Sequence, residues 1–411
     1  SSIKSSVEGA ANALPNIQVM SMTIWDGSAK LDSACDLPAR SSGLSARTTS
    51  TSCPTSSPTN RAADESAPPS RCSTPRSTAA EADSGWFTRQ SSAFSAATSA
   101  LCYAEPGQTL LFLDWDDTLF PTSDIFREER NARRDPFGLN EEESDNDQDE
   151  RVEALDRWRN ELRRFLETAC AVSDRCVIVT NSARPWVTNS VRIFAPDLEP
   201  LFERSDGKGL HVVYAVEAMR EHRWSWCLRG ARSCHAGVEA WIRKGLRINS
   251  ARPSSLEELT LSKQFAMRRE AQSFYARYPG QTWKNIISFG DMCFEHDALW
   301  QVTSSRLQAS PRDRLRTKAI TLPEASKIGT LANHLAVAAT LLPAYVAFDG
   351  DIDLDLRRAA IPLQEVGKAL QMPRLAAHSF NPYGYGYEEQ GVPEKVLDEL
   401  ACIVHERFAA L

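Results

Sequence analysis

The sequence predicts an α/β domain built on a doubly wound, mostly parallel sheet. Short apolar runs at residues 110–113, 176–179 and 286–289 each end abruptly in polar residues. Residues 152–171 have helical periodicity and lie between the first two runs, so a right-handed crossover would make their strands parallel. In sheets of this kind the ligand binds beyond the carboxyl ends of the strands, where these polar residues lie.

Composition divides the 411-residue chain into three parts. Residues 1–104 are rich in Ser, Thr, Ala and Pro and poor in large apolar side chains, so we expect a disordered or weakly ordered arm. Residues 105–348 should form the α/β domain, with little or no additional cap domain. Residues 349–411 are expected to form a C-terminal extension that packs on this core.

Charge and cysteine usage exclude several classes of protein. A formal net charge of -7 gives no indication of nucleic-acid binding. The ten cysteines lack paired spacing, which favours a reduced, intracellular and cytoplasmic setting over a disulfide framework. No apolar run is typical of a secretory signal, and Leu331 to Phe348 is better interpreted as an amphipathic helix followed by a strand than as a membrane span.

The strand at residues 110–113 runs directly into a group of carboxylates, Asp114, Asp116 and Asp117. Past the strand end, the turn can aim Asp114 and Asp116 at one small volume. Crowded carboxylates cannot both ionise at low cost, unless one binds a cation and the other holds a proton. A carboxylate can attack phosphorus while a neighbouring carboxylic acid protonates the leaving oxygen. The alternative is an acidic turn that caps the following segment.

The D-x-D-x-T pattern from Asp114 to Thr118 resembles motif I of the Mg-dependent phosphatases in the haloacid dehalogenase (HAD) superfamily. This resemblance implies a Rossmann-like fold in which Asp114 is the nucleophile and Asp116 the general acid/base. It also implies that Asp114 binds Mg²⁺, that Asp116 gives Mg²⁺ a backbone carbonyl, and that Thr118 supports the loop around the phosphate.

The second strand end, Thr180 and Asn181, resembles motif II of the same superfamily. Hydroxyl groups and backbone amides before a helix suit a phosphate oxygen, so the resemblance makes Thr180 and Asn181 phosphate-binding residues. A helix cap is the alternative for Thr180. Arg184 lies on the following turn, from which it could reach the phosphate or be fixed by Pro185 and Trp186.

Lys263, in a segment of helical periodicity at residues 261–278, is our candidate for motif III. By the resemblance it neutralises the phosphate and the crowded carboxylates, a role that a point charge suits. The motif has almost no local signature. A solvated lysine remains an alternative, and Lys208 and Lys244 remain rivals.

The strand at residues 286–289 ends in Gly290 and Asp291, which resembles motif IV. Asp291 would then complete the Mg²⁺ site, with either Glu295 or Asp297 assisting. The interpretation requires Asp291 to lie within about 10 Å of Asp114, because shared coordination is impossible at a longer range.

Further elements are predicted with no chemical role. We expect strands at 210–214 and 318–322, helices at 331–342 and 392–411, a flap at 120–140 and an aromatic loop at 379–387. The flap carries four arginines for which contact with an anionic substrate and a solvated loop are the two alternatives: Arg127, Arg130, Arg133 and Arg134.

Together these residues predict a Mg²⁺-dependent phosphomonoester hydrolase that acts through an aspartyl-phosphate. The substrate is expected to be a phosphorylated small molecule or a phosphoprotein. The alternative is a HAD-like domain that serves as a regulated protein-interaction module without significant catalysis. The intact acids at Asp114, Asp116 and Asp291 favour the enzyme.

Overall fold

The computed structural model describes residues 102–127, 145–203, 209–222, 256–277, 282–306, 314–323, 325, 327–381 and 391–409. The predicted arm lies almost wholly outside these residues. Three of the four flap arginines, Lys208, Lys244 and most of the predicted aromatic loop also lie outside them.

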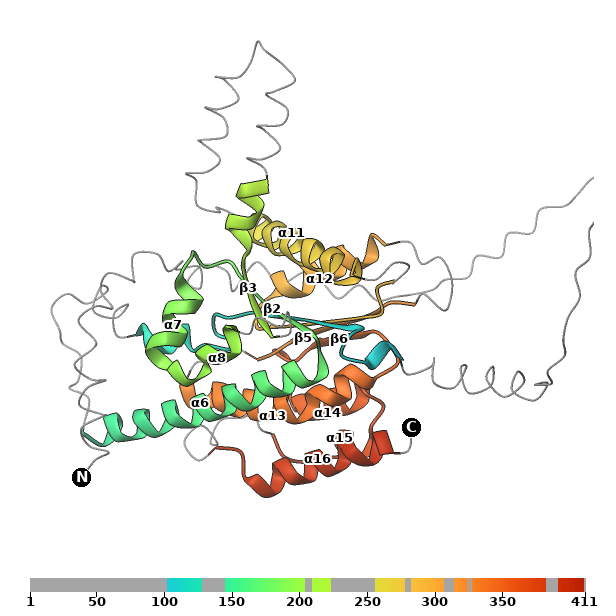
Figure 1. Ribbon diagram of the computed structural model, residues 1–411. Coiled ribbons are helices and arrows are strands. Elements are labelled where there is room, and N and C mark those ends of the chain that lie inside the picture. The colour runs from blue at the N-terminus through green and yellow to red at the C-terminus, as the bar shows by residue number, and fades with distance from the viewer. Residues whose placement is uncertain are drawn as a thin grey trace, which may run out of the picture. The chain divides into compact units, whose positions relative to one another are not determined.

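A single six-stranded sheet, parallel throughout, forms the centre of the described domain (Figure 1). The strands follow the order β3-β2-β1-β4-β5-β6. Their bounds are β1 Thr109–Leu113, β2 Arg175–Thr180, β3 Leu210–Tyr214, β4 Asn285–Gly290, β5 Arg316–Thr321 and β6 Ile352–Asp355. The order reverses between β1 and β4, which is the point where doubly wound sheets open a ligand-binding crevice.

Strand β1 is buried along its whole length because helices cover both faces of the sheet. Its side chains alternate between two cores. Leu111 and Leu113 belong to one apolar cluster, and Leu110 and Phe112 belong to the other. The sequence prediction of a buried strand with no exposed face is therefore confirmed.

Two layers of helices sandwich the sheet (Figure 1). Helices α11 (Leu256–Tyr275) and α12 (Cys293–Ser304) pack on one face. The other face carries α6 (Asp145–Val172), α13 (Ile328–Ala347) and α16 (Glu394–Ala409). The shorter elements are η4 Cys102–Ala104, α4 Thr122–Ile125, α7 Trp186–Phe194, η5 Pro196–Leu198, α8 Glu199–Phe202, α14 Pro362–Ala369 and α15 Pro373–Ala376.

Helix α13 corrects one expectation. We predicted an amphipathic helix ending at residue 342 and then a strand, but the helix continues through Pro343 to Ala347 and is buried almost throughout. It packs against α6 and α16 and shares one apolar cluster with them and the sheet, so it has no solvated face to create amphipathic periodicity. Among the described residues it is the one helix long and apolar enough to cross a membrane, and most of it is buried within this domain.

The sixth strand comes from the predicted C-terminal extension. Ile352 and Leu354 of β6 are buried, whereas Asp353 and Asp355, which alternate with them, are exposed. Strand β6 pairs in parallel with β5, so residues after 349 complete the sheet in addition to packing on it. We did not predict this strand because half of its four residues are acidic, and only two apolar residues alternate with them.

Candidate active site

Asp114 and Asp291 follow the two strands that flank the reversal of strand order. Asp114 comes directly after β1 and Asp291 directly after β4, and the Asp114 N–H donates to the Phe289 carbonyl at 2.9 Å. One carboxylate oxygen from each of Asp114, Asp291 and Glu295 lies within 4.8 Å of the others, and all three residues are buried. The structure thus meets the requirement that Asp291 lie within about 10 Å of Asp114.

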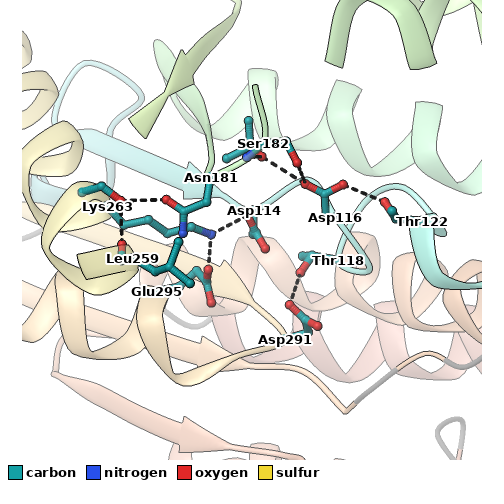
Figure 2. A network of polar contacts seen from close by, with 12 residues as sticks. Asp114, Asp116, Thr118, Thr122, Asn181, Ser182, Leu259, Lys263, Asp291 and Glu295 are labelled. Atoms are coloured by element: carbon teal, nitrogen blue, oxygen red, sulfur yellow. Dashed lines mark hydrogen bonds and ion pairs between the residues drawn. The ribbon is translucent and has the colours of Figure 1, made fainter. Parts of the chain in front are cut away.

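Lys263 reaches this carboxylate cluster from α11. Its Nζ lies 2.6 Å from Oδ1 of Asp114 and also forms an ion pair with Glu295, and the residue is only 2% exposed (Figure 2). Burial alone would lower the pKa of Lys263, but the attraction of Asp114 and Glu295 outweighs it and raises that pKa above its ordinary value. Lys263 therefore stays charged.

If all three acids of the cluster ionised, their negative charge would exceed the single positive charge of Lys263. Burial raises the pKa of Asp114 to about 8, with Glu295 and Asp116 adding to the rise and Lys263 opposing it. Burial, together with Asp114 and Glu295, also raises the pKa of Asp291 well above its ordinary value. A second cation would relieve this repulsion.

The residues of the cluster suit a hard divalent cation such as Mg²⁺, which prefers carboxylate oxygens. Oxygen Oε2 of Glu295 is buried and has no hydrogen-bond partner among the described residues. Gly290 makes room for this side chain, because a Cβ at position 290 would lie 2.5 Å from Cγ of Glu295. Of the two candidates Glu295 and Asp297, Glu295 lies in the cluster, whereas Asp297 contacts His296 at the surface.

Asp116 belongs to a different set of contacts. Its carboxylate is turned toward Thr122 and Ser182 in Figure 2, and it is not one of the three clustered acids. Four side chains donate hydrogen bonds to it: Thr122 Oγ1 at 2.7 Å and Trp186 Nε1 at 2.7 Å to Oδ1, and Thr180 Oγ1 at 3.0 Å and Ser182 Oγ at 2.7 Å to Oδ2. A metal contact through the backbone carbonyl of Asp116 stays a prediction.

The three predicted phosphate-binding residues with polar, uncharged side chains all lie at this site. Thr118 Oγ1 donates to Asp291 Oδ1 at 3.2 Å, whereas the Thr180 hydroxyl donates to Asp116. Asn181 Oδ1 accepts a 2.8 Å hydrogen bond from Ser262 Oγ, beside Lys263 on α11. These hydrogen bonds connect the strand ends to one another and to α11, and binding of phosphate by these residues stays a prediction.

The described arginines that we considered as phosphate ligands contact carboxylates instead. The Arg184 guanidinium lies 3.5 Å from Glu217 and over the ring of Tyr214, and its side chain is largely exposed. Arg127 lies 3.4 Å from Asp124. In the described part of the chain, Lys263 is the one cationic side chain that bonds to the clustered acids.

Sequence reasoning missed Thr122, Ser182 and Trp186 as partners of Asp116. Trp186 begins α7 and packs edge-on against Phe120, with ring centroids 5.4 Å apart, which brings its indole N–H to Asp116. A signal was present for Ser182, which follows the predicted strand end at residue 179 closely, whereas Thr122 lies well beyond the strand end at residue 113. No local pattern indicates the indole contact, which depends on how two loops pack.

Comparisons of the chain with protein-family models, curated proteins and solved structures give no match. What is established is a Rossmann-like parallel α/β fold with a buried acidic cluster at its switch point. Any assignment of function therefore depends on the chemistry of this cluster.

Proposed function

We propose that the protein is a Mg²⁺-dependent phosphomonoester hydrolase of the HAD type, with Asp114 as the nucleophile. One observation carries the proposal. Asp114, Lys263, Asp291 and Glu295, which are widely separated in sequence, meet at the switch point of a parallel sheet. The site combines a candidate nucleophile, one cation and oxygen ligands for a second cation, which phosphoryl transfer requires.

In the first step, Asp114 attacks the phosphorus atom of the substrate. Lys263 holds Oδ1 of Asp114, so we assign the attack to Oδ2. As the new O–P bond forms, the bond from phosphorus to the leaving oxygen breaks, and Asp116 gives its proton to that oxygen. The products are an alcohol and an aspartyl-phosphate.

In the second step, the ionised Asp116 takes a proton from water. The water oxygen bonds to phosphorus, the bond to Oδ2 of Asp114 breaks, and the Asp114 carboxylate is restored as inorganic phosphate leaves. The proton taken from water returns Asp116 to its acid form, so charge and protons balance over the cycle.

Asp114, Asp291 and Glu295 would hold Mg²⁺ through carboxylate oxygens. When bound, the cation supplies positive charge that offsets the repulsion between the substrate phosphate and these carboxylates. Lys263 adds a fixed positive charge on the α11 side of Asp114. Phosphorylated small molecules and phosphoproteins are the substrate classes that we propose.

Hydrolysis of p-nitrophenyl phosphate with Mg²⁺ or with EDTA tests the proposal. We expect turnover by the wild type only with Mg²⁺, and its loss in Asp114→Asn. Asp297→Asn is the matched control, because this exposed carboxylate lies next to the site but outside the cluster. Turnover that is insensitive to EDTA, or Asp114→Asn activity within about tenfold of the wild type, would contradict the proposal.

A further inference from the structure

The Asp116 carboxylate can take part in proton transfer only if its hydrogen bonds change. A carboxylate has about four lone-pair positions, and four donors already bond to Asp116, two on each oxygen. A proton can therefore be placed on this carboxylate only where one of the four partners reverses or gives up its hydrogen bond.

The four donors differ in whether they can reverse. A hydroxyl can donate or accept, so Thr122 on Oδ1 and both Thr180 and Ser182 on Oδ2 can reverse their hydrogen bonds. An indole N–H can only donate. Oδ1 must therefore remain an acceptor for Trp186, whereas both donors to Oδ2 can reverse.

The position of Trp186 is also fixed by packing. The residue is 6% exposed, and its ring lies against Phe120 and Phe126 at centroid distances of 5.4 and 5.7 Å. This packing prevents the indole from following Asp116 if the carboxylate rotates. The indole N–H therefore has a fixed position, and its hydrogen bond holds the Asp116 carboxylate in one orientation.

We propose that Trp186 is a positioning residue that holds Oδ1 of Asp116 as a hydrogen-bond acceptor and so fixes the orientation of the carboxylate, leaving Oδ2 as the oxygen that reacts. The proposal rests on the proposed function, because it assigns an orientation to the general acid of that reaction. The indole N–H bonds to Oδ1 as the carbonyl oxygen of the acid, and in the proposed reaction the proton passes from Oδ2 to the leaving oxygen of the substrate. Asp116 is then ionised again, and all four donors bond to its carboxylate.

The leaving group of the substrate provides a readout that a purely structural role would not change. An alkyl phosphate needs a proton on its leaving oxygen, whereas p-nitrophenolate leaves without one. For Trp186→Phe we expect kcat on an alkyl phosphate to fall at least about tenfold more than kcat on p-nitrophenyl phosphate. An equal fall on both substrates would overturn the proposal.

Trp158→Phe is the matched control. Trp158 is buried in the same aromatic cluster, and its Nε1 donates to the backbone carbonyl of Leu119 rather than to Asp116. Its loss should leave the ratio of the two activities unchanged. If Trp186→Phe does not fold, benzothienylalanine at position 186 keeps the bicyclic ring and removes only the N–H, so the same ratio can be measured.

The indole N–H signal of Trp186 in an NMR spectrum tests the contact without any turnover. We expect this signal, assigned by its absence in Trp186→Phe, to move in Asp116→Asn and to stay in place in Asp297→Asn. A signal that does not respond to Asp116→Asn would refute the contact. A wild type that hydrolyses neither ester would instead refute the proposed function, while the signal still shows whether Trp186 holds Asp116.

Discussion

The ammonium group of Lys263 lies 2.6 Å from Oδ1 of Asp114, although 149 positions separate the two residues in sequence. Both side chains are buried, and Glu295 shares the same ammonium. The contact joins α11 to the end of β1 and places a permanent positive charge next to the candidate nucleophile.

Replacing Lys263 by Met should impair both stability and catalysis. The substitution leaves buried Asp114 and Glu295 without their cationic partner, which costs about 3–5 kcal/mol of unfolding free energy without Mg²⁺. Turnover should fall by at least about 100-fold, since a charge aimed at the transferring phosphate is lost. Urea denaturation and a phosphatase assay measure the two effects.

Lys368→Met is the control for that experiment. Lys368 pairs with Glu365 on the exposed surface of α14, where such pairs contribute about 0–1 kcal/mol. Equal losses of unfolding free energy in the two lysine variants would show that the buried ion pair contributes no more to stability than the exposed one.

Gly290→Ala should weaken Mg²⁺ binding selectively. The new Cβ would lie 2.5 Å from Cγ and 2.7 Å from Oε2 of Glu295, so the Glu295 carboxylate must move out of the cluster. We expect the Mg²⁺ concentration for half-maximal activity to rise about tenfold or more, as for other disturbed metal ligands. Gly107→Ala serves as the control, because its Cβ would make only an ordinary 3.7 Å contact. An unchanged Mg²⁺ requirement in Gly290→Ala would exclude Glu295 as a ligand.

Mg²⁺ should stabilise the folded protein without any substrate. Binding to the folded state alone adds about 2.7 kcal/mol when Mg²⁺ is present at 100 times its dissociation constant. We expect the melting temperature of the wild type to rise with Mg²⁺ and that of Asp291→Asn to change little, because Asp291 is one of the three clustered ligands. A similar rise in both proteins would place the cation elsewhere.

His334, buried on α13, should make the protein sensitive to acid. Burial lowers its pKa to about 3, against about 6.5 in the unfolded chain. Below pH 6.5 the unfolded state gains a proton that the folded state does not, so the free energy of unfolding falls as pH decreases from about 6.5 toward 3.

The His334→Gln variant removes this titration. Between pH 7 and pH 5 its unfolding free energy should fall by about 2 kcal/mol less than that of the wild type. Urea denaturation at the two pH values measures the difference, and exposed His405→Gln on α16 is the control. Parallel behaviour of the wild type and His334→Gln would contradict the assignment.

The sequence predicted those parts of the fold that depend on local pattern. Strands β1, β2 and β4 are short apolar runs that end in polar residues, so both the strands and the polar edge beyond them could be predicted from the sequence. Strand β6 was missed because Asp353 and Asp355 interrupt its apolar residues. The end of α13 was wrong because a buried environment allows a helix to continue past Pro343.

At the site, prediction succeeded where a residue follows a strand directly. The edge of a parallel sheet brings such residues together, and Asp114 and Asp291 lie there as expected. Glu295 could not be distinguished from Asp297, because that choice depends on the direction in which α12 leaves Gly290. Trp186 was missed because its contact with Asp116 arises from packing between loops.

Detection of a phosphoryl group on Asp114 tests the central claim most directly. Asp116→Asn should slow hydrolysis of the aspartyl-phosphate, because the base that activates water is removed, so the intermediate should accumulate with p-nitrophenyl phosphate and Mg²⁺. After acid quenching and peptide mass spectrometry, we predict one phosphoryl group on Asp114. A phosphoryl group on another residue, or none under conditions where p-nitrophenol is released, would contradict the account.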